Sequence, residues 1–410
     1  MEKIDRGLIL WLASAAAFLL IARLGQITAG IIKPFDLLMI IIGAYFFPRR
    51  AVLLFLKERR KEWLPFVWCA GAISFFLIIG QATGFFGGAG IIEITKDIAL
   101  NHVRALFNSA VFFLTAGLIA YYPDLLVMVS RAVFFSPVLI IPAFFGFGRA
   151  LYFDGGRLSG LFNNANIFAG WLAVIFIIGL YFSLFSRIFW ARAASTAWLA
   201  IIAACIIWSG SRASWIAVFI GVFIFLVCIV ARTRRIIFVW LMPAITLGAF
   251  FVGFFLLPPR VKDFHEDRFV SFVQAPTKNQ SRVEIWGKVI PVIISHPFGG
   301  GFDYFVSEQN RIITENETVV FTTNAVLEAG IAGGWGAIAA LLFIIIHLGK
   351  KIVAKCRDLS TLEIAWVAGC IALIITIMFI DGFLFRHVWF ILGIILGIAL
   401  KKHGAHETAN

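Results

Sequence analysis

Apolar residues in this chain form a series of long runs that are separated by short polar loops. We place the cores of these runs at residues 8–30, 34–48, 64–86, 101–121, 124–146, 164–186, 194–209, 212–231, 236–257, 322–348, 363–381 and 386–400. A helix of about 20 apolar residues spans the roughly 30 Å hydrocarbon core of a bilayer. A soluble domain would alternate apolar and polar faces instead. The pattern predicts an all-α, polytopic membrane protein, residues 1–410 forming a single domain of about 12 transmembrane helices.

One loop is longer and more polar than the others, and it extends over residues 258–321. Apolar residues from Val283 to Ile293 recur there with a helical period. Ser281 and Glu284 match the capping box that begins a helix, and His296-Pro297 ends the pattern. We therefore expect an amphipathic helix over residues 281–295 at the outer membrane interface. A second short outer helix is expected over residues 88–100.

The formal net charge of the chain is +13, although only 14% of its residues are charged. The basic loops 49–61, 187–192, 232–235, 350–357 and 401–402 all fall on one side of a membrane if both termini are cytoplasmic. This distribution is typical of cytoplasmic loops that meet anionic lipid headgroups, so we expect membrane lipids and no nucleic acid as partners. The five cysteines contain no CxxC pair. We therefore predict neither a disulfide framework nor a metal site, and no cofactor.

A second set of arginines has no anchoring role, because its members lie at the opposite ends of the spans. They are Arg149, Arg157, Arg212, Arg282 and Arg386. Arg212 opens an apolar run and Arg282 opens the amphipathic helix, so each lies where helix N–H groups and the helix dipole favour anions. A guanidinium group is also well shaped to bind phosphate oxygens. Together with Arg157, and with Asn163, Asn164 and Asn166 nearby, they predict a site for a lipid-linked diphosphate at headgroup depth.

Several of these residues also have ordinary structural interpretations. Any single arginine is explained as well by snorkelling or by a structural ion pair. For Asp381, Arg386 and His387, which flank the last outer turn, we favour an ion pair that ties two spans together. In the long loop, Trp286 and Tyr304 offer aromatic faces on which sugar rings can stack.

Four stretches within residues 150–340 resemble, in order, the motifs of one family. The first is residues 157–170, which resembles an Arg-x-x-Gly-Thr-Phe-x-Asn-Pro-Asn stretch, and the second is Ser209 to Arg212, which resembles a Ser-Arg motif. The third joins residues 282–286 to residues 296–301, which are similar to an Arg-x-x-x-Trp helix and a His-Pro-x-x-Gly-x-Gly turn. The fourth is residues 327–333, similar to a Glu-x-Gly-x-x-Gly entry to a span. These motifs are those of the O-antigen ligase and polymerase family of bacterial envelope glycosyltransferases.

The resemblance implies a GT-C-type membrane glycosyltransferase that is inverting and metal-independent. Such an enzyme transfers an oligosaccharide from undecaprenyl diphosphate to an acceptor hydroxyl at the periplasmic face of the bacterial inner (cytoplasmic) membrane. The acceptor is lipid A–core for a ligase or a second lipid-linked glycan for a polymerase. By this resemblance Arg212 and Arg282 hold the diphosphate. Further substrate contacts are expected at Arg149, Arg157, Asn163, Asn166, Ser211, Trp286, His296 and Asn324.

The chain departs from the family pattern in one respect. Ligases of the family carry a histidine just before the Glu-x-Gly motif, where it is proposed to activate the acceptor hydroxyl. Residues 318–324 occupy that region here and contain no histidine. The candidates for a general base are Glu317, Glu328, Asp303 and His296. Glu328 is equally well explained as the counter-charge of an outer arginine, and His296 as a turn residue before Pro297.

Other functions remain as alternatives. A transporter or flippase of lipid-linked saccharides would show repeats and ionisable residues near the midplane of the membrane, and we find neither. A structural scaffold gives no reason for arginines at outward helix starts. A protein O-oligosaccharyltransferase is a related enzyme that the motifs do not exclude, whereas their order argues against a peptidoglycan polymerase.

Overall fold

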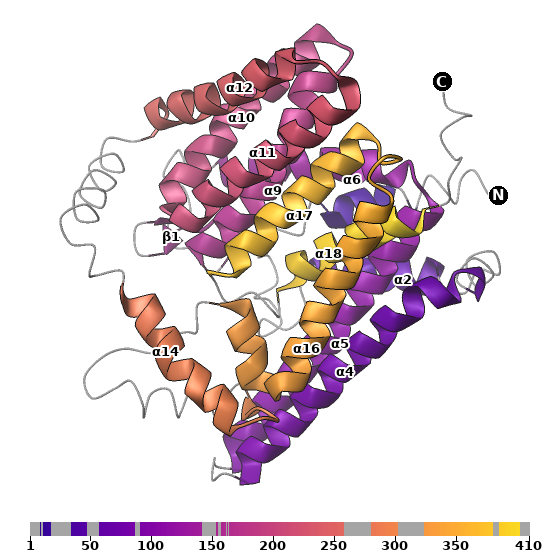
Figure 1. Cartoon of the computed structure of the whole chain (residues 1–410), viewed down its shortest axis with the longest axis vertical. Coiled ribbons are helices and arrows are strands. Elements are labelled where there is room, and N and C mark those ends of the chain that lie inside the picture. Colours follow the sequence, from indigo (N-terminus) through magenta and orange to yellow (C-terminus); the bar gives the residue numbers. More distant parts are fainter. Residues whose placement is uncertain are drawn as a thin grey trace.

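The computed structural model describes residues 9, 11–17, 34–46, 57–86, 91–141, 153–154, 157–160, 162, 164–257, 280–301, 324–379 and 385–401. Figure 1 shows the arrangement of these segments, which are almost entirely helical. The elements are α2 (Pro34–Phe46), α4 (Arg60–Phe86), α5 (Ile91–Tyr121), α6 (Leu125–Phe135), η2 (Ser136–Ile140), β1 (Phe153–Asp154), β2 (Arg157–Leu158), α9 (Ala165–Phe185), α10 (Phe189–Ser209), α11 (Arg212–Thr233), α12 (Ile237–Phe255), α14 (Gln280–Ser295), α16 (Ala325–Ala354), α17 (Thr361–Ile377) and α18 (Arg386–Leu400).

The helical fold and its membrane character agree with the sequence. Among the described residues, seven helices are long and apolar enough to cross a membrane, one in each of α4, α5, α9, α10, α11, α12 and α16. Shorter apolar helices include α2, α17 and α18. The chain is therefore a multi-pass helical membrane protein. The count of about 12 spans stays a prediction, as does the extent of the long outer loop, because residues 258–279 and 302–323 lie outside the described part.

Three local features differ from the expectation. The short outer helix expected over residues 88–100 is the start of α5, which runs unbroken from Ile91 because no glycine or proline precedes Gly117 to interrupt it. The run after Asp124 forms α6 and then the 3₁₀ helix η2, whose Pro137 cannot donate the next helical hydrogen bond. The chain also contains a small antiparallel hairpin, in which β1 and β2 pair Asp154 with Arg157.

The helices form two packed groups that meet at α17 and α18 (Figure 1). In one group α16 packs on α4, and α18 packs on α5. In the other, α9 packs against α10, α11 and α17, and α12 packs on α10. Helix α9 lies at the centre of this second group, where nearly every residue from Ala165 to Leu180 is buried. A helix that is apolar all round, with no polar face, fits such a position.

Small residues allow these helices to approach closely. A β-carbon at Gly170 would lie 2.7 Å from the side chain of Thr376, and one at Gly221 would lie 2.3 Å from Ile177. Glycine at such points allows van der Waals contact between spans in a medium where lipid tails are as apolar as the side chains. The contact of Gly170 with Thr376 also shows that α9 and α17 run in opposite directions, since the first turns of α9 meet the last turn of α17.

The charged residues separate to two ends of the molecule. We call one the hairpin end: it carries the β1–β2 hairpin, the C-terminus of α10 and the N-termini of α9, α11, α16 and α18. We call the other the basic end: it carries the loops before α10, α12 and α17 and the last residue described, Lys401. Arg157, Arg212 and Arg386 lie at the hairpin end. This is the separation of the two arginine sets that the sequence predicts.

Helix α16 contains a break near the hairpin end, and two other segments pack into it. Gly334 has φ 66° and ψ −160°, a conformation essentially restricted to glycine. The Trp335 amide donates to the carbonyl of Pro297 at 3.0 Å, and the Gly300 amide donates to the carbonyl of Ile331 at 2.9 Å. From α4, a β-carbon at Gly80 would lie 2.1 Å from the carbonyl oxygen of Ala332. We call this contact of α4, α16 and the turn after α14 the glycine interlock.

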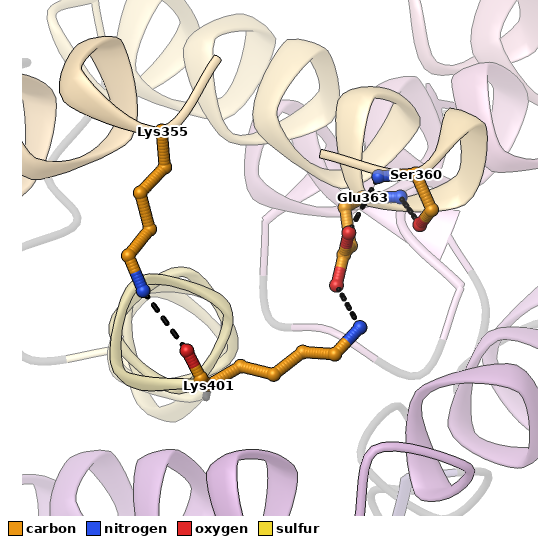
Figure 2. A network of polar contacts seen from close by, with 4 residues as sticks. All are labelled: Lys355, Ser360, Glu363 and Lys401. Carbon is orange, nitrogen blue, oxygen red and sulfur yellow. Dashed lines mark hydrogen bonds and ion pairs between the residues drawn. The ribbon is translucent and has the colours of Figure 1, made fainter. Parts of the chain in front are cut away.

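The basic end is held partly by a polar network that joins three helices (Figure 2). Ser360 and Glu363 form a reciprocal capping box at the start of α17. The Glu363 carboxylate pairs with the ammonium group of Lys401 at 3.0 Å, after the end of α18. Lys355, at the end of α16, donates to the Lys401 carbonyl at 2.9 Å. The ends of α16 and α18 and the start of α17 are thus connected at this end.

Candidate anion site at the hairpin end

The turn between α10 and α11 is the centre of the candidate site. Gly210 caps α10 in a left-handed conformation, with φ 64°, which glycine adopts without steric cost. The Ser209 hydroxyl donates to the Ile206 carbonyl at 2.6 Å, and the Ser211 and Ser214 hydroxyls lie 3.0 Å apart. All three serines are buried. The turn is therefore rigid, and Ser211 stabilises it; a contact between Ser211 and a substrate stays a prediction.

Arg157 attaches the hairpin to this turn. Its Nε donates to the Ser209 carbonyl at 2.6 Å, and its Nη2 donates to Oδ1 of Asn166 at 2.5 Å. Asn164 caps α9 by accepting from the Asn166 amide at 2.8 Å. Arg157 and Asn166, both predicted to contact a substrate, therefore make protein contacts that join β2, α9 and α10. The sequence did not indicate this role for Arg157, since its main acceptor is a backbone carbonyl 52 residues away.

Arg212 begins α11 directly after this turn, and its side chain is exposed. The Ser211 hydroxyl, at the N-cap position, accepts no hydrogen bond from the backbone N–H groups of the first turn of α11. Helices α9 and α16, whose N-termini lie at the same end, are each capped by an asparagine side chain. The start of α11 thus lacks the N-cap acceptor that α9 and α16 have, and the backbone N–H groups at such a helix start favour an anion.

The amphipathic helix predicted in the long loop is present as α14, one residue longer at its start than expected. Val289 and Ile293 are buried against Ile331 of α16, which gives the helix its apolar face. The half-buried ring of Trp286 lies 6.2 Å from that of Phe379. Arg282 lies in the first turn of α14; the structure describes its backbone only. Its distance from Arg212 is therefore not described, and its role stays a prediction.

His296 follows the last residue of α14 and lines, with Gly299, Gly300 and Ile331, a small, partly open pocket. Its Nδ1 lies 3.0 Å from the Val292 carbonyl and from the Ser295 hydroxyl. The ring is thus held at the end of the helix, in agreement with its interpretation as a turn residue. A contact of His296 with a substrate and a role of His296 as the general base both stay predictions.

Asn324 caps α16. Its Oδ1 accepts from the amides of Val326 and Leu327, at 2.9 and 3.2 Å, and its Nδ2 donates to the Met378 carbonyl at 3.0 Å. Each polar atom of the side chain therefore has a protein partner, and the residue connects the start of α16 to the end of α17. Its predicted contact with a substrate is not tested.

Glu328 lies in the first turn of α16 and is half-buried, at the same end as Arg212. Of the remaining predicted site residues, Arg149 and Asn163 lie outside the described residues. The alternative bases Asp303 and Glu317 also lie outside them. The general base is therefore not identified. Within the part of the chain that is described, no group of three His, Cys, Asp or Glu side chains is arranged to hold a metal ion.

The sequence suggested that Arg386 forms an ion pair between two helices. In the structure Arg386 does form such a pair, and its partner among the described residues is Asp36 of α2. Its Nε lies 2.6 Å from Oδ1 of Asp36, so the pair connects α18 to α2. Asp381, the partner considered from the sequence, lies outside the described residues. His387 is buried against the aromatic rings of Phe162, Trp171 and Phe385. Both residues thus have structural roles at the hairpin end.

The fold and this site define the class of protein: a multi-pass helical membrane protein with two arginines, Arg157 and Arg212, at one turn between its helices. Residues 197–344, from α10 to the second half of α16, match the O-antigen ligase family. The match supports assignment of the chain to that family, and with it a function of ligase or polymerase type in the assembly of membrane glycans. The matched residues include Arg212 and Arg282. They also include the glycine interlock, apart from Gly80 of α4. No curated protein matches the chain.

Proposed function

We propose that the protein is an inverting, metal-independent glycosyltransferase of the ligase or polymerase type. It transfers an oligosaccharide from undecaprenyl diphosphate to the hydroxyl of lipid A–core or of a second lipid-linked glycan. The hairpin end faces the periplasm, both termini are cytoplasmic, and the membrane is the bacterial inner membrane. The family match supports the type of reaction. The donor, the acceptor and the orientation are the proposed parts.

The observation that carries the proposal is the surroundings of Arg212. The exposed guanidinium group of Arg212 lies at a helix start that has no side-chain N-cap. The turn before this helix is held by the side chain of Arg157, which donates to the backbone carbonyl of Ser209. Both the guanidinium group and free helix N–H groups favour phosphate oxygens. The sequence stretch 155–262 around this turn contains no Asp or Glu, so the turn and the helices beside it carry only positive formal charge.

The reaction has simple requirements. The acceptor oxygen attacks the anomeric carbon, the bond from that carbon to the diphosphate breaks, and the hydroxyl proton passes to a base. A fixed positive charge stabilises the diphosphate as negative charge develops on it, which is the kind of electrostatic stabilisation that dominates many enzymes. Arg212 and Arg282 supply that charge, and the reaction further requires that the acceptor hydroxyl is held close to the anomeric carbon. Glu328 is the described carboxylate nearest in sequence to the position of the family histidine.

Product analysis tests this function directly. The purified protein is mixed with a lipid-diphosphate oligosaccharide and with either lipid A–core or a second lipid-linked glycan. We expect a new glycosidic linkage with inverted anomeric configuration. Extension of lipid A–core would indicate a ligase, and extension of the second lipid-linked glycan would indicate a polymerase. A chelator should leave the rate unchanged. In proteoliposomes, movement of labelled carrier across the bilayer without a new linkage would indicate a transporter and refute the proposal.

A further inference from the structure

The basic end carries five arginines in or beside two loops, between α9 and α10 and between α11 and α12. We call them the arginine patch: Arg187, Arg192, Arg232, Arg234 and Arg235. All five side chains are exposed, and among the described residues none of them forms an ion pair. Arg192 donates to the carbonyl of Ser186, which leaves its charge without a counter-ion. The patch therefore concentrates positive charge without internal compensation.

The sequence explains why compensation is absent. No Asp or Glu occurs between Asp154 and Asp263, a stretch that includes all of α9, α10, α11 and α12. Anchoring a span requires only a small excess of Lys and Arg beside it. A run of four helices without a single acidic residue goes beyond that requirement.

The two loops lie side by side, so their charges form one surface. The rings of Phe185, just before the first loop, and Phe238, just after the second, are 5.4 Å apart. Helix α12 packs along α10 from the same end. Each helix begins with large exposed apolar residues, among them Trp190, which is 77% exposed, and Trp240, which is 73% exposed. Tryptophan beside basic residues is the composition of a protein surface at the boundary between hydrocarbon and headgroups.

Arg234 adds an independent observation. It ends α11 in the left-handed conformation, with φ 53°, and among the described residues it is the only residue other than glycine with a positive φ. A side chain with a β-carbon is disfavoured there relative to glycine, because the β-carbon comes too close to the following carbonyl oxygen. Glycine would end the helix at lower cost, as Gly210 does for α10. A charged side chain at this position is therefore better explained by what it contacts outside the chain.

The other half of the basic end has a different arrangement. There Arg59 pairs with Glu62 at 2.7 Å, and Lys401 pairs with Glu363 in the network of Figure 2. Lys355 is partly withdrawn from water; burial lowers its pKa, and the Glu62 carboxylate opposes this change. Arg59 and Lys401 in this half thus have acidic partners within the protein. The contrast between the halves locates the uncompensated charge at the start of α10 and around the loop between α11 and α12.

We propose that the arginine patch, together with Trp190 and Trp240, is a binding surface for the headgroups of anionic phospholipids. Phosphodiester oxygens supply the missing negative charge, and guanidinium groups bind them in a paired geometry. The indole rings lie at the depth of the glycerol backbone, where one side is apolar and the other is hydrated. Each basic residue near an anionic leaflet adds to the attraction, so five of them favour anionic over zwitterionic lipid strongly.

Thermal unfolding of the purified full chain in mixed micelles tests this proposal. Phosphatidylglycerol is compared with phosphatidylcholine of the same acyl chains at equal mole fraction. A ligand that binds the folded state raises the Tm, and we expect phosphatidylglycerol to raise it about 2–4 °C more than phosphatidylcholine does. The combined substitution Arg187→Gln, Arg192→Gln, Arg232→Gln and Arg235→Gln should remove at least half of this difference. The difference should also shrink in high salt, because screening weakens exposed charges.

Two further variants separate lipid binding from folding. Arg234→Gly removes a charge but relieves the left-handed strain, so its Tm without added lipid should equal or exceed that of the wild type, while its response to phosphatidylglycerol falls. Lys61→Gln with Lys350→Gln removes two exposed charges from the other half of the basic end and should retain the full response. Equal responses to the two lipids, or a full response in the four-arginine variant, would overturn the proposal. If the patch instead bound an acidic protein, the responses to the two lipids would be equal.

Discussion

Arg157 and Arg212 meet at one turn but have different surroundings. The guanidinium group of Arg157 binds the Ser209 carbonyl and Asn166, so its geometry is fixed by the protein. Arg212 projects from the first position of α11 and is exposed. The two arginines therefore differ in role. Arg157 holds the turn in position, whereas Arg212 is the residue that we propose to bind a ligand.

The first prediction concerns Arg212. We expect Arg212→Ala to lower the rate of sugar transfer by about 100-fold to 1000-fold, the usual effect of removing one group that stabilises developing negative charge. The Tm should change little, because an exposed first-turn residue is not part of the packed core. The measurement is the initial rate of product formation by purified variants. Lys350→Ala, exposed at the basic end, is the matched control and should keep the wild-type rate. A wild-type rate in Arg212→Ala would exclude this residue from the site.

The same scale shows which site residues the sequence could indicate. Arg212 was predictable because its position depends only on the next residues along the chain, a turn followed by an apolar run. The protein contacts of Arg157 and Asn324 were not, since their partners Ser209 and Met378 are more than 50 residues away. The ion pair of Asp36 with Arg386 was not predictable for a similar reason, because no residue near Asp36 in the sequence indicates that its partner is Arg386.

At the scale of elements, the hydrophobic pattern located the helices well. The limits of α11 and α18 follow from an apolar run that begins at an arginine. The break in α16 was missed, because glycine is frequent in membrane helices and a Gly-Gly pair does not by itself indicate that the helix is interrupted. The break depends on segments distant in sequence: Gly80 on α4 and the turn after α14 pack into it. Tertiary contacts of this kind leave no periodic signal.

The second prediction tests the glycine interlock. In Gly80→Ala the new β-carbon would lie 2.1 Å from the Ala332 carbonyl oxygen, so α4 and α16 must separate. We expect a loss of about 2–3 kcal/mol of stability, typical of overpacking where the neighbour is backbone, measured as a lower Tm. Gly71→Ala is the matched control on the same helix, where no atom lies within 4 Å. It should be neutral or slightly stabilising, since alanine favours helix. Equal Tm values for the two variants would contradict this packing.

At the scale of the whole molecule, the two ends carry different kinds of positive charge. At the hairpin end, Arg157 and Arg386 are half-buried in protein contacts, and Arg212 lies at a helix start. At the basic end, the arginine patch forms one half, and in the other half Arg59 and Lys401 pair with glutamates. This polarity along the spans is the physical basis for the proposed orientation in the membrane.

The third prediction tests that orientation with a native thiol. Cys356 is exposed at the basic end, directly after Lys355. In right-side-out vesicles, a membrane-impermeant maleimide should not label the wild-type protein until the membrane is permeabilised. The Ser295→Cys variant, with an exposed residue at the end of α14, should be labelled without permeabilisation. Cys356→Ser serves as the control for the permeabilised reaction. Labelling of Cys356 in intact vesicles would reverse the proposed topology.

The central place of α9 has a consequence for how the protein can be divided. The family match begins at residue 197, inside α10, and therefore excludes α9 and Arg157. It also ends before α17, which covers α9 and α11. A polypeptide cut at those limits would lose the helix around which its neighbours are arranged, and the arginine that ties the Ser209 turn in place. We therefore expect that the matched part of the sequence does not fold on its own, and that a minimal version of this protein has to begin upstream of the hairpin.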